Sequence, residues 1–290
     1  MSVGAGSIGG VTNEIRAVEE ALERLISGLG TLNHLAEQLS TLRSGELHAG
    51  VQISRLERVL DFERVAAHVR GAVARAELVD QPIPHLLAST LLPPDVFAVV
   101  VDAIPSRVFF EGRAVEGQEL RVPPRLAPTH AIVTWMFLND IVLRTLSNIV
   151  LARFAEPLAA YTRERFPELP PFGDWNVEIT LSQARIVRRA AGSAGRKSTE
   201  RPWDFLNGIV SLARDRESEE YGGTLHGMAC PLRANTALIY LGPVEAYTCA
   251  SIPSDAPAKV EQYTYEFGIG PAAAARHRLT GLMGSVGRRG

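Results

Sequence analysis

The sequence predicts an α+β protein, with a helical first half and a β-rich second half. Apolar residues recur with the 3.6-residue period of amphipathic helices over residues 12–80. Beyond about residue 176, short apolar or alternating runs are separated by clusters of Gly, Pro, Asp and Ser. This spacing is typical of all-β barrels and sandwiches. No sequence repeat of fixed period is found, which argues against a solenoid or a propeller.

Apolar stripes mark the helices expected in the first 80 residues. Breaks at 27–30 and 44–50 separate these helices, and their stripes have to be buried against other protein surface. We therefore predict a domain at 1–80 that forms either a homodimer interface or a lid. The stripe residues are Ile15, Val18, Leu22, Leu25, Ile26 and Leu29, followed by Leu56, Val59, Leu60, Ala66 and Val69.

Prolines bound the next helix. After a linker at 81–85, Pro93 and Pro94 precede Asp95, and Pro105 follows the apolar run. Proline is favoured in the first turn of a helix and disfavoured in its interior. The pattern therefore predicts a helix between Asp95 and Pro105.

The most apolar long run, residues 131–154, contains Asn139, Asp140 and Arg144. These side chains would be costly at the centre of a bilayer, so a buried helix with one polar stripe is favoured over a membrane span. Asp140 and Arg144 have the i,i+4 spacing of a helical ion pair. The helical pattern continues to about residue 166, and we expect Pro157 to divide it.

Strands are expected in two short runs before the long helix and in six runs after it. The candidates are residues 107–112, 118–123, 177–190, 207–213, 222–229, 235–242, 246–253 and 259–270.

The composition excludes several classes of protein. The formal net charge is −2 and the pI about 6.4, so no electrostatic argument favours nucleic acid or an anionic membrane. Cys230 and Cys249 lack the spacing of a zinc site or a disulfide framework, which fits a reducing cytoplasm. The first ten residues lack the basic and apolar regions of a signal peptide. We therefore expect a cytoplasmic protein.

Two glycine-rich stretches resemble phosphate-binding loops without meeting their requirements. "GAGSIG" at 4–9 matches G-x-G-x-x-G, but no strand can precede it within three residues. In "GSAGRKST" at 192–199, Arg196 separates the last Gly from the Lys, and Pro202 opposes a following helix. Neither stretch is predicted to bind phosphate.

Residues 202–227, 233–257 and 260–271 resemble the C-terminal half of Fe(II)/2-oxoglutarate-dependent oxygenases, and the similarity extends upstream to 83–105. The resemblance implies a double-stranded β-helix, or jelly roll, over residues 81–290. Members of this family hold iron through His-x-Asp/Glu and a distal His, and an Arg pairs with the far carboxylate of 2-oxoglutarate.

The resemblance places these functional positions on residues that are mostly unsuitable. The first His and the acid fall at Ser198 and Glu200, the distal His at Tyr247 or Thr248, and the Arg at Gln262. No His occurs within 188–208 or 241–270. Only Glu200 keeps a suitable group, so we predict a metal-binding strand whose ligands have been replaced, with no metal and no cofactor.

The function predicted from this pattern is a metal-independent enzyme, a cyclase, isomerase or lyase, acting on a small molecule such as a secondary metabolite. Glu200 is the candidate general acid or base, and Tyr247 and His226 are candidates to orient or protonate the substrate. Ser198, Trp203, Gln262 and Tyr263 are candidates to bind the substrate, although a residue such as Trp203 more often belongs to a core.

Three alternatives stay open. The protein could be an iron oxygenase using Fe(II), 2-oxoglutarate and unexpected ligands such as Glu200 and His226. It could be a non-catalytic scaffold whose helical front carries the interaction, or a structural domain with a misleading family likeness. A basic cluster could hold an anion, but a solvated loop is favoured for it; its members are Arg188, Arg189, Arg196, Lys197 and Arg201.

Overall fold

The computed structural model describes residues 56–112, 117–124, 127–169, 172–174, 178–194, 203–214, 223–230, 232–242, 247–257, 260–276 and 279. The chain divides into two compact units, Met1–Arg55 and Leu56–Gly290, and the described residues all belong to the second. The helices expected within 12–55 lie outside the described residues. The homodimer or lid that they would form therefore stays a prediction.

The second unit is α+β, as predicted, and its described strands form two antiparallel sheets. One sheet has seven strands in the order β1-β2-β8-β5-β10-β4-β3, and the other has three in the order β7-β6-β9. The strands of the larger sheet are β1 Leu78–Val79, β2 His85–Ala88, β3 Gln118–Arg121, β4 Ile179–Ala190, β5 Leu206–Ser211, β8 Ala237–Leu241 and β10 Glu261–Pro271. Those of the smaller sheet are β6 Gly223–Leu225, β7 Met228–Cys230 and β9 Tyr247–Cys249.

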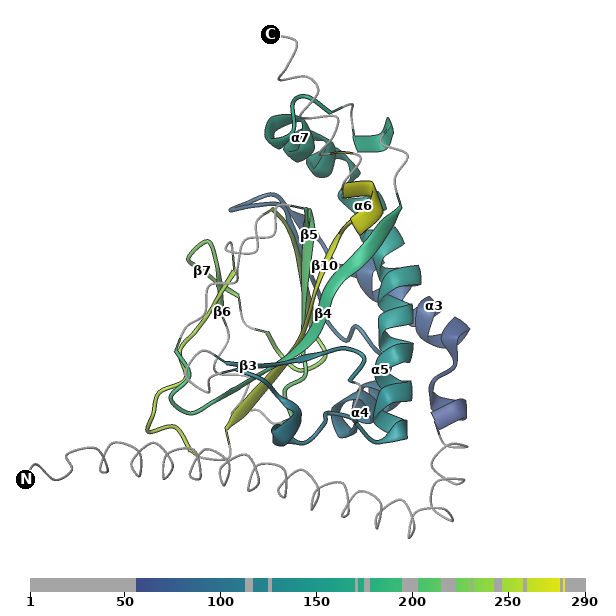
Figure 1. Ribbon diagram of the computed structural model, residues 1–290. Helices are drawn as coiled ribbons and strands as arrows, with labels where there is room; N and C mark the ends of the chain where they lie inside the picture. Colours follow the sequence, from purple (N-terminus) through teal and green to yellow (C-terminus); the bar gives the residue numbers. More distant parts are fainter. Residues whose placement is uncertain are drawn as a thin grey trace, which may run out of the picture. The chain divides into compact units, whose positions relative to one another are not determined.

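Helices cover one face of the larger sheet, and the smaller sheet lies on its other side (Figure 1). Helix α3 begins after the N-cap Asp61, whose side chain accepts a hydrogen bond of 2.7 Å from the backbone of Arg64. The helical segments are α3 Phe62–Arg75, α4 Pro94–Asp102, η1 Arg107–Phe109, α5 Thr129–Ile141, η2 Val142–Leu146, α6 Ser147–Arg153, α7 Ala155–Arg165 and η3 Phe172–Asp174.

The long apolar run forms a continuous helix through α5, η2 and α6. Among the described residues, this stretch, Thr129–Arg153, is long and apolar enough by length and composition to cross a membrane. One face of it is part of the protein core, as predicted, since Trp135 and Leu138 are buried. Asp140 and Arg144 form the predicted ion pair, with 2.7 Å between Oδ1 and Nε.

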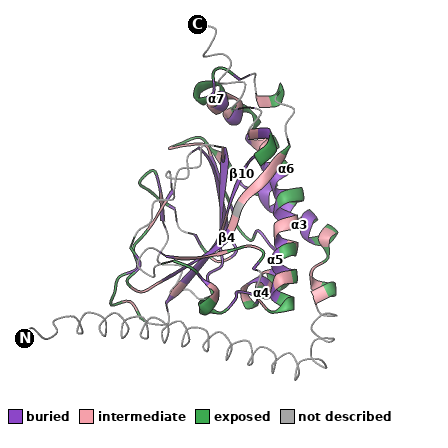
Figure 2. Cartoon of the chain, in the orientation of Figure 1, coloured by how far each residue is buried: buried purple, intermediate pink, exposed green. Residues whose placement is uncertain are grey.

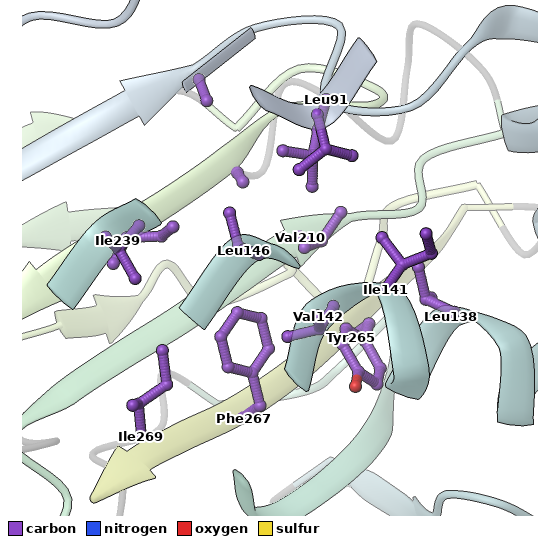
Figure 3. Close-up of a cluster of buried hydrophobic side chains, with 14 of the residues drawn as sticks. Leu91, Leu138, Ile141, Val142, Leu146, Val210, Ile239, Tyr265, Phe267 and Ile269 are labelled. Carbon is purple, nitrogen blue, oxygen red and sulfur yellow. The ribbon is translucent and has the colours of Figure 1, made fainter. Parts of the chain in front are cut away.

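The main core lies between this helix and β10. Burial follows the inner faces of the helices and the strands of the larger sheet (Figure 2). Figure 3 shows Tyr265, Phe267 and Ile269 of β10 against Leu138, Ile141, Val142 and Leu146 of the helix. Because side chains alternate along a strand, those of Gln262, Thr264 and Glu266 on β10 point to the opposite face, toward the smaller sheet.

The structure differs from the predicted elements in three places. The segment 81–85, predicted as a linker, leads into strand β2. This strand pairs with β8, and His85 lies opposite Tyr240. Residues 107–109 form a turn of 3-10 helix instead of a strand. The long helix breaks at Phe154, and Pro157 stands in the first turn of α7, where proline needs no backbone hydrogen bond.

Candidate functional site

The two sheets face each other across a layer of side chains that we call the intersheet layer. Its apolar members come from both sheets and pack as one cluster. They are Ile209, Leu225, Cys230, Leu232, Leu238, Tyr240 and Tyr247, with Ile83 and Cys249 at the margin. Side chains of β4 and β10 that point away from the helices complete the layer, and these are mostly polar.

Two arginines of β4, four residues apart, enter this layer on the same face of the strand. Arg185 lies opposite Glu266 in the sheet, and its Nη2 is 2.8 Å from Glu266 Oε2. Its Nη1 is 3.0 Å from Oε2 of Glu119 on β3. Burial alone would lower the pKa of Arg185, but the two carboxylates outweigh burial and raise it. Arg185 is therefore a buried charge that is well compensated.

Arg189 has neutral partners instead. It lies opposite Gln262 of β10, is 2% exposed, and its Nη1 donates a hydrogen bond of 2.8 Å to Gln262 Oε1. Its Nη2 donates to the backbone carbonyl of Ala250, just beyond β9, so the side chain bridges the two sheets. Within the described part of the chain, its buried Nε has no hydrogen-bond partner, and no carboxylate forms an ion pair with it. A buried guanidinium without a counter-charge is costly, so this position is a candidate anion site.

Tyr247 of β9 stands in the same layer, packed over Gly223 of β6. A Cβ at Gly223 would overlap the hydroxyl and Cζ of Tyr247, so the glycine makes room for the phenol. Burial raises the pKa of Tyr247 well above its ordinary value, and the thiols of Cys249 and Cys230 raise it further. The hydroxyl therefore stays protonated at physiological pH and is available as a hydrogen-bond donor.

The structure brings two of the predicted site residues into the intersheet layer, namely Tyr247 and Gln262. Tyr263 lies on the opposite face of β10, where its hydroxyl donates to Glu261 Oε2 at 2.8 Å and its ring contacts Phe110. Tyr263 therefore belongs to the side of the sheet that carries the helices.

Two further candidates lie away from this layer. The ring of Trp203 stacks on Phe166, with 5.1 Å between ring centroids, and its backbone carbonyl packs against Gly270. His226 is exposed at the tip of the β6–β7 hairpin, with φ of 47° followed by φ of 82° at Gly227. Two residues with positive φ match the tight turn of a two-residue hairpin, so the place of His226 is explained by the turn.

Ser198 and Glu200 lie outside the described residues, and so do Arg196, Lys197 and Arg201 of the basic cluster. For Arg188 and Arg189, the favoured interpretation as a solvated loop is wrong, because both are buried on β4, between β10 and the edge strand β3 of the larger sheet. Arg188 points to the helix side, where its Nη2 is 2.6 Å from Glu261 Oε1.

Sequence reasoning named Arg189 only within a basic cluster for which a solvated loop was favoured, and did not single it out as a site residue. The signal was present in "RIVRRA", where an alternating strand carries two adjacent arginines toward opposite faces. Which of the two would lack a carboxylate could not be predicted, because Gln262 and Glu261 lie more than seventy residues further along the chain.

Among the described side chains, the buried guanidinium of Arg189 is suited to bind an organic anion. Among them, no group of three or more His, Cys, Asp or Glu residues is arranged to hold a metal. Residues 195–202, where the family resemblance places two ligands, lie outside the described part of the chain. The guanidinium of Arg189 can pair with a carboxylate in the bidentate manner that arginine favours.

No protein-family model matches the sequence, and no curated protein matches it. The fold is similar to solved structures of Fe(II)/2-oxoglutarate-dependent oxygenases. One is a viral collagen prolyl hydroxylase from Paramecium Bursaria Chlorella virus-1 in its 2OG complex, at 10% identity and a TM-score of 0.35, covering 65% of this chain and 96% of that chain. Another is HygX from Streptomyces hygroscopicus with nickel and 2-oxoglutarate bound, at 11% identity and a TM-score of 0.36, covering 65% of this chain and 83% of that chain.

A third similar structure is the non-heme alpha ketoglutarate dependent carbocyclase SnoK from nogalamycin biosynthesis, at 11% identity and a TM-score of 0.35, covering 72% of this chain and 86% of that chain. At such identities and scores the likeness assigns no residue of this chain a role.

These similarities contradict the prediction that the protein uses no cofactor. The similar structures are of 2-oxoglutarate-dependent enzymes, and two contain 2-oxoglutarate, one of them together with nickel. The prediction rested on residues replaced at the positions expected from the family. A replaced residue does not exclude that a neighbour supplies the same group, and here Arg189 brings a guanidinium beside Gln262. The inference of a cofactor-free protein is therefore withdrawn.

Proposed function

We propose that the protein is a small-molecule enzyme that binds an organic acid between its two sheets, with a carboxylate of that acid on Arg189. The observation that supports the proposal is the pairing of Arg189. This buried guanidinium has only neutral oxygens as described partners, and one N–H has none. The effective penalty for burying a charge is several kcal/mol, which a bound carboxylate would offset.

The neighbouring arginine supports this interpretation by contrast. Arg185 lies on the same strand face and is compensated by Glu119 and Glu266. Had Arg189 only a structural role, a Glu at position 262 could pair with it in the same way, since the register across β4 and β10 is equivalent. The chain instead has the neutral Gln262, which leaves the positive charge for a ligand.

The ligand class that we propose is a 2-oxo dicarboxylate such as 2-oxoglutarate, or an organic acid of similar size. The carboxylate would accept hydrogen bonds from the guanidinium of Arg189. A metal ion, when bound, would supply Lewis-acid or redox chemistry, but the described residues do not provide its ligands, so we assign no step to it.

The reaction classes predicted from the sequence are cyclisation, isomerisation, elimination and hydroxylation. Each acts on an organic small molecule and is compatible with a carboxylate held at Arg189. Analysis of the products formed from candidate acids, with and without added Fe(II) and 2-oxoglutarate, would distinguish them.

The test is calorimetric titration of 2-oxoglutarate into the purified protein, without metal and with Fe(II) under anaerobic conditions. We expect binding in both arms, and Arg189→Gln should weaken it between tenfold and a hundredfold, about the value of charge-assisted hydrogen bonds. Arg188→Gln is the matched control, because Arg188 is the adjacent buried arginine and faces the other side of the sheet. Equal binding by wild type and Arg189→Gln would exclude the proposed site.

A further inference from the structure

We propose that the hydroxyl of Tyr247 donates a hydrogen bond to a second oxygen-bearing group of the acid that Arg189 holds. The inference rests on the proposed function and deepens it. It restricts the ligands to acids with a further carbonyl, hydroxyl or carboxylate group, and excludes simple monocarboxylates as good ligands.

The first observation that supports the proposal is the packing of the Tyr247 ring over Gly223. Gly223 lies on β6, the central strand of the smaller sheet, and pairs in register with Cys230 of β7 and Cys249 of β9. The Tyr247 ring covers this glycine so closely that a Cβ would overlap its hydroxyl and Cζ. Glycine weakens a strand interior and often marks a close approach by another group. The packing therefore holds the phenol in one position between the sheets.

The second support is the hydroxyl itself. Buried tyrosine hydroxyls usually have a hydrogen-bond partner. Among the described residues the Tyr247 hydroxyl has no hydrogen-bond partner, and it is not one of their fully buried unpartnered atoms, so a ligand oxygen can reach it. The ring of Tyr247 also contacts Tyr240, with 6.5 Å between the ring centroids. The hydroxyls of Tyr263 and Tyr265, in contrast, donate to Glu261 and Asn139. A ligand oxygen would supply the partner that the protein does not.

The third support is that Tyr247 and Arg189 are within reach of one small molecule. The guanidinium of Arg189 donates to the carbonyl of Ala250, three residues beyond Tyr247 along the chain. At about 3.3 Å per residue, the backbone of Ala250, which Arg189 contacts, lies within about 10 Å of the backbone of Tyr247. The positive charge of Arg189 also acts on the Tyr247 phenol, where it opposes the rise of the pKa, so the two polar groups lie near each other.

The other polar groups near Tyr247 are less suited than its phenol to donate a hydrogen bond to the ligand. The thiols of Cys230 and Cys249 are weak donors, and Glu266 already accepts from Arg185 and Thr264. Because burial raises the pKa of Tyr247, its hydroxyl keeps the proton that such a hydrogen bond needs.

The experiment compares the binding of 2-oxoglutarate to wild type, Tyr247→Phe and Tyr263→Phe. We expect Tyr247→Phe to weaken binding about fivefold, the scale of one neutral hydrogen bond. Tyr263→Phe is the matched control: it removes a hydroxyl on the opposite face of the sheet and should leave the affinity unchanged. Pentanoate, which has one carboxylate and no other oxygen group, should bind weakly and equally to wild type and Tyr247→Phe.

Thermal unfolding of the same variants excludes an indirect effect. Tyr247→Phe removes no hydrogen bond within the described residues, so its Tm without ligand should equal that of the wild type. A second variant, Gly223→Ala, should displace the phenol and weaken 2-oxoglutarate binding to a similar extent. If wild type binds 2-oxoglutarate and Tyr247→Phe binds it equally well, this inference alone is overturned. If wild type does not bind it, the proposed function fails as well.

Discussion

Arg189 donates a hydrogen bond of 2.8 Å to Gln262, the residue directly opposite it in the β4–β10 pair. Four residues along the same strand, Arg185 meets the carboxylate of Glu266 in the equivalent relation. Among the described residues, carboxylates thus compensate Arg185 but not Arg189. In the proposed function, this difference separates a structural charge, that of Arg185, from the charge of Arg189 that a ligand would pair with.

The first prediction is that methionine at these two positions has opposite effects on stability. Arg185→Met should destabilise the fold by about 3 kcal/mol, because it leaves the carboxylates of Glu119 and Glu266 without their partner. The double variant Arg189→Met/Gln262→Leu should be at least as stable as wild type, since it removes a buried charge together with its neutral partner. Urea unfolding followed by circular dichroism measures both. A large loss in the double variant would show that Arg189 is structural.

The second prediction concerns the close packing of Gly208 against the aromatic ring of Phe267. A Cβ at Gly208 would overlap three ring atoms, so Gly208→Ala should cost about 2 kcal/mol through overpacking. The double variant Gly208→Ala/Phe267→Leu should recover part of this loss. Gly173→Ala is the control, because nothing lies within 4 Å of a Cβ there. Equal melting temperatures for the two alanine variants would contradict the described packing.

The third prediction concerns Asn235, which joins the loop before β8 to the chain after β2. Its side chain accepts from Leu92 N at 2.9 Å and donates to Leu92 O at 2.8 Å, and its φ is 57°. Asn235→Ala should cost about 3 kcal/mol, because two buried backbone groups lose their partners and alanine is strained at positive φ. Asn235→Gly loses the same hydrogen bonds without that strain, so it should be about 1 kcal/mol more stable than Asn235→Ala. The measurement is chemical unfolding of the two variants.

The fourth prediction is a loss of stability at alkaline pH that depends on Cys230. Burial raises the pKa of this thiol to about 11. The unfolded chain therefore releases the proton first, so the contribution of Cys230 to stability is complete below the unfolded value of about 8.5. It is then lost as the pH rises toward 11, with a slope of at most about 1.4 kcal/mol per pH unit. Urea midpoints between pH 8 and pH 10.5 should fall less steeply for Cys230→Ala than for wild type; parallel curves would be evidence against the shift.

Much of the fold could be predicted from local pattern. Alternation over "VEITLSQARIVRRA" and "KVEQYTYEFGIG" corresponds to β4 and β10, and proline positions indicated where α4 begins and ends. The local pattern is sufficient for these segments, because the period of their apolar residues matches the helix or strand that places those residues on one buried face. The same rules failed for β2, whose strand conformation depends on pairing with β8 about 150 residues away.

The sequence by itself determined the order of most helices and strands and brought Tyr247 and Gln262 forward as candidates. Only the tertiary structure decided that Arg189 meets Gln262 while Arg185 meets Glu266, that Tyr263 turns to the helices, and that His226 occupies a hairpin tip. Side-chain chemistry and hydrophobic periodicity can be read from short segments of the sequence. Whether a charge finds a counter-charge depends on which distant residue the sheet register places across from it.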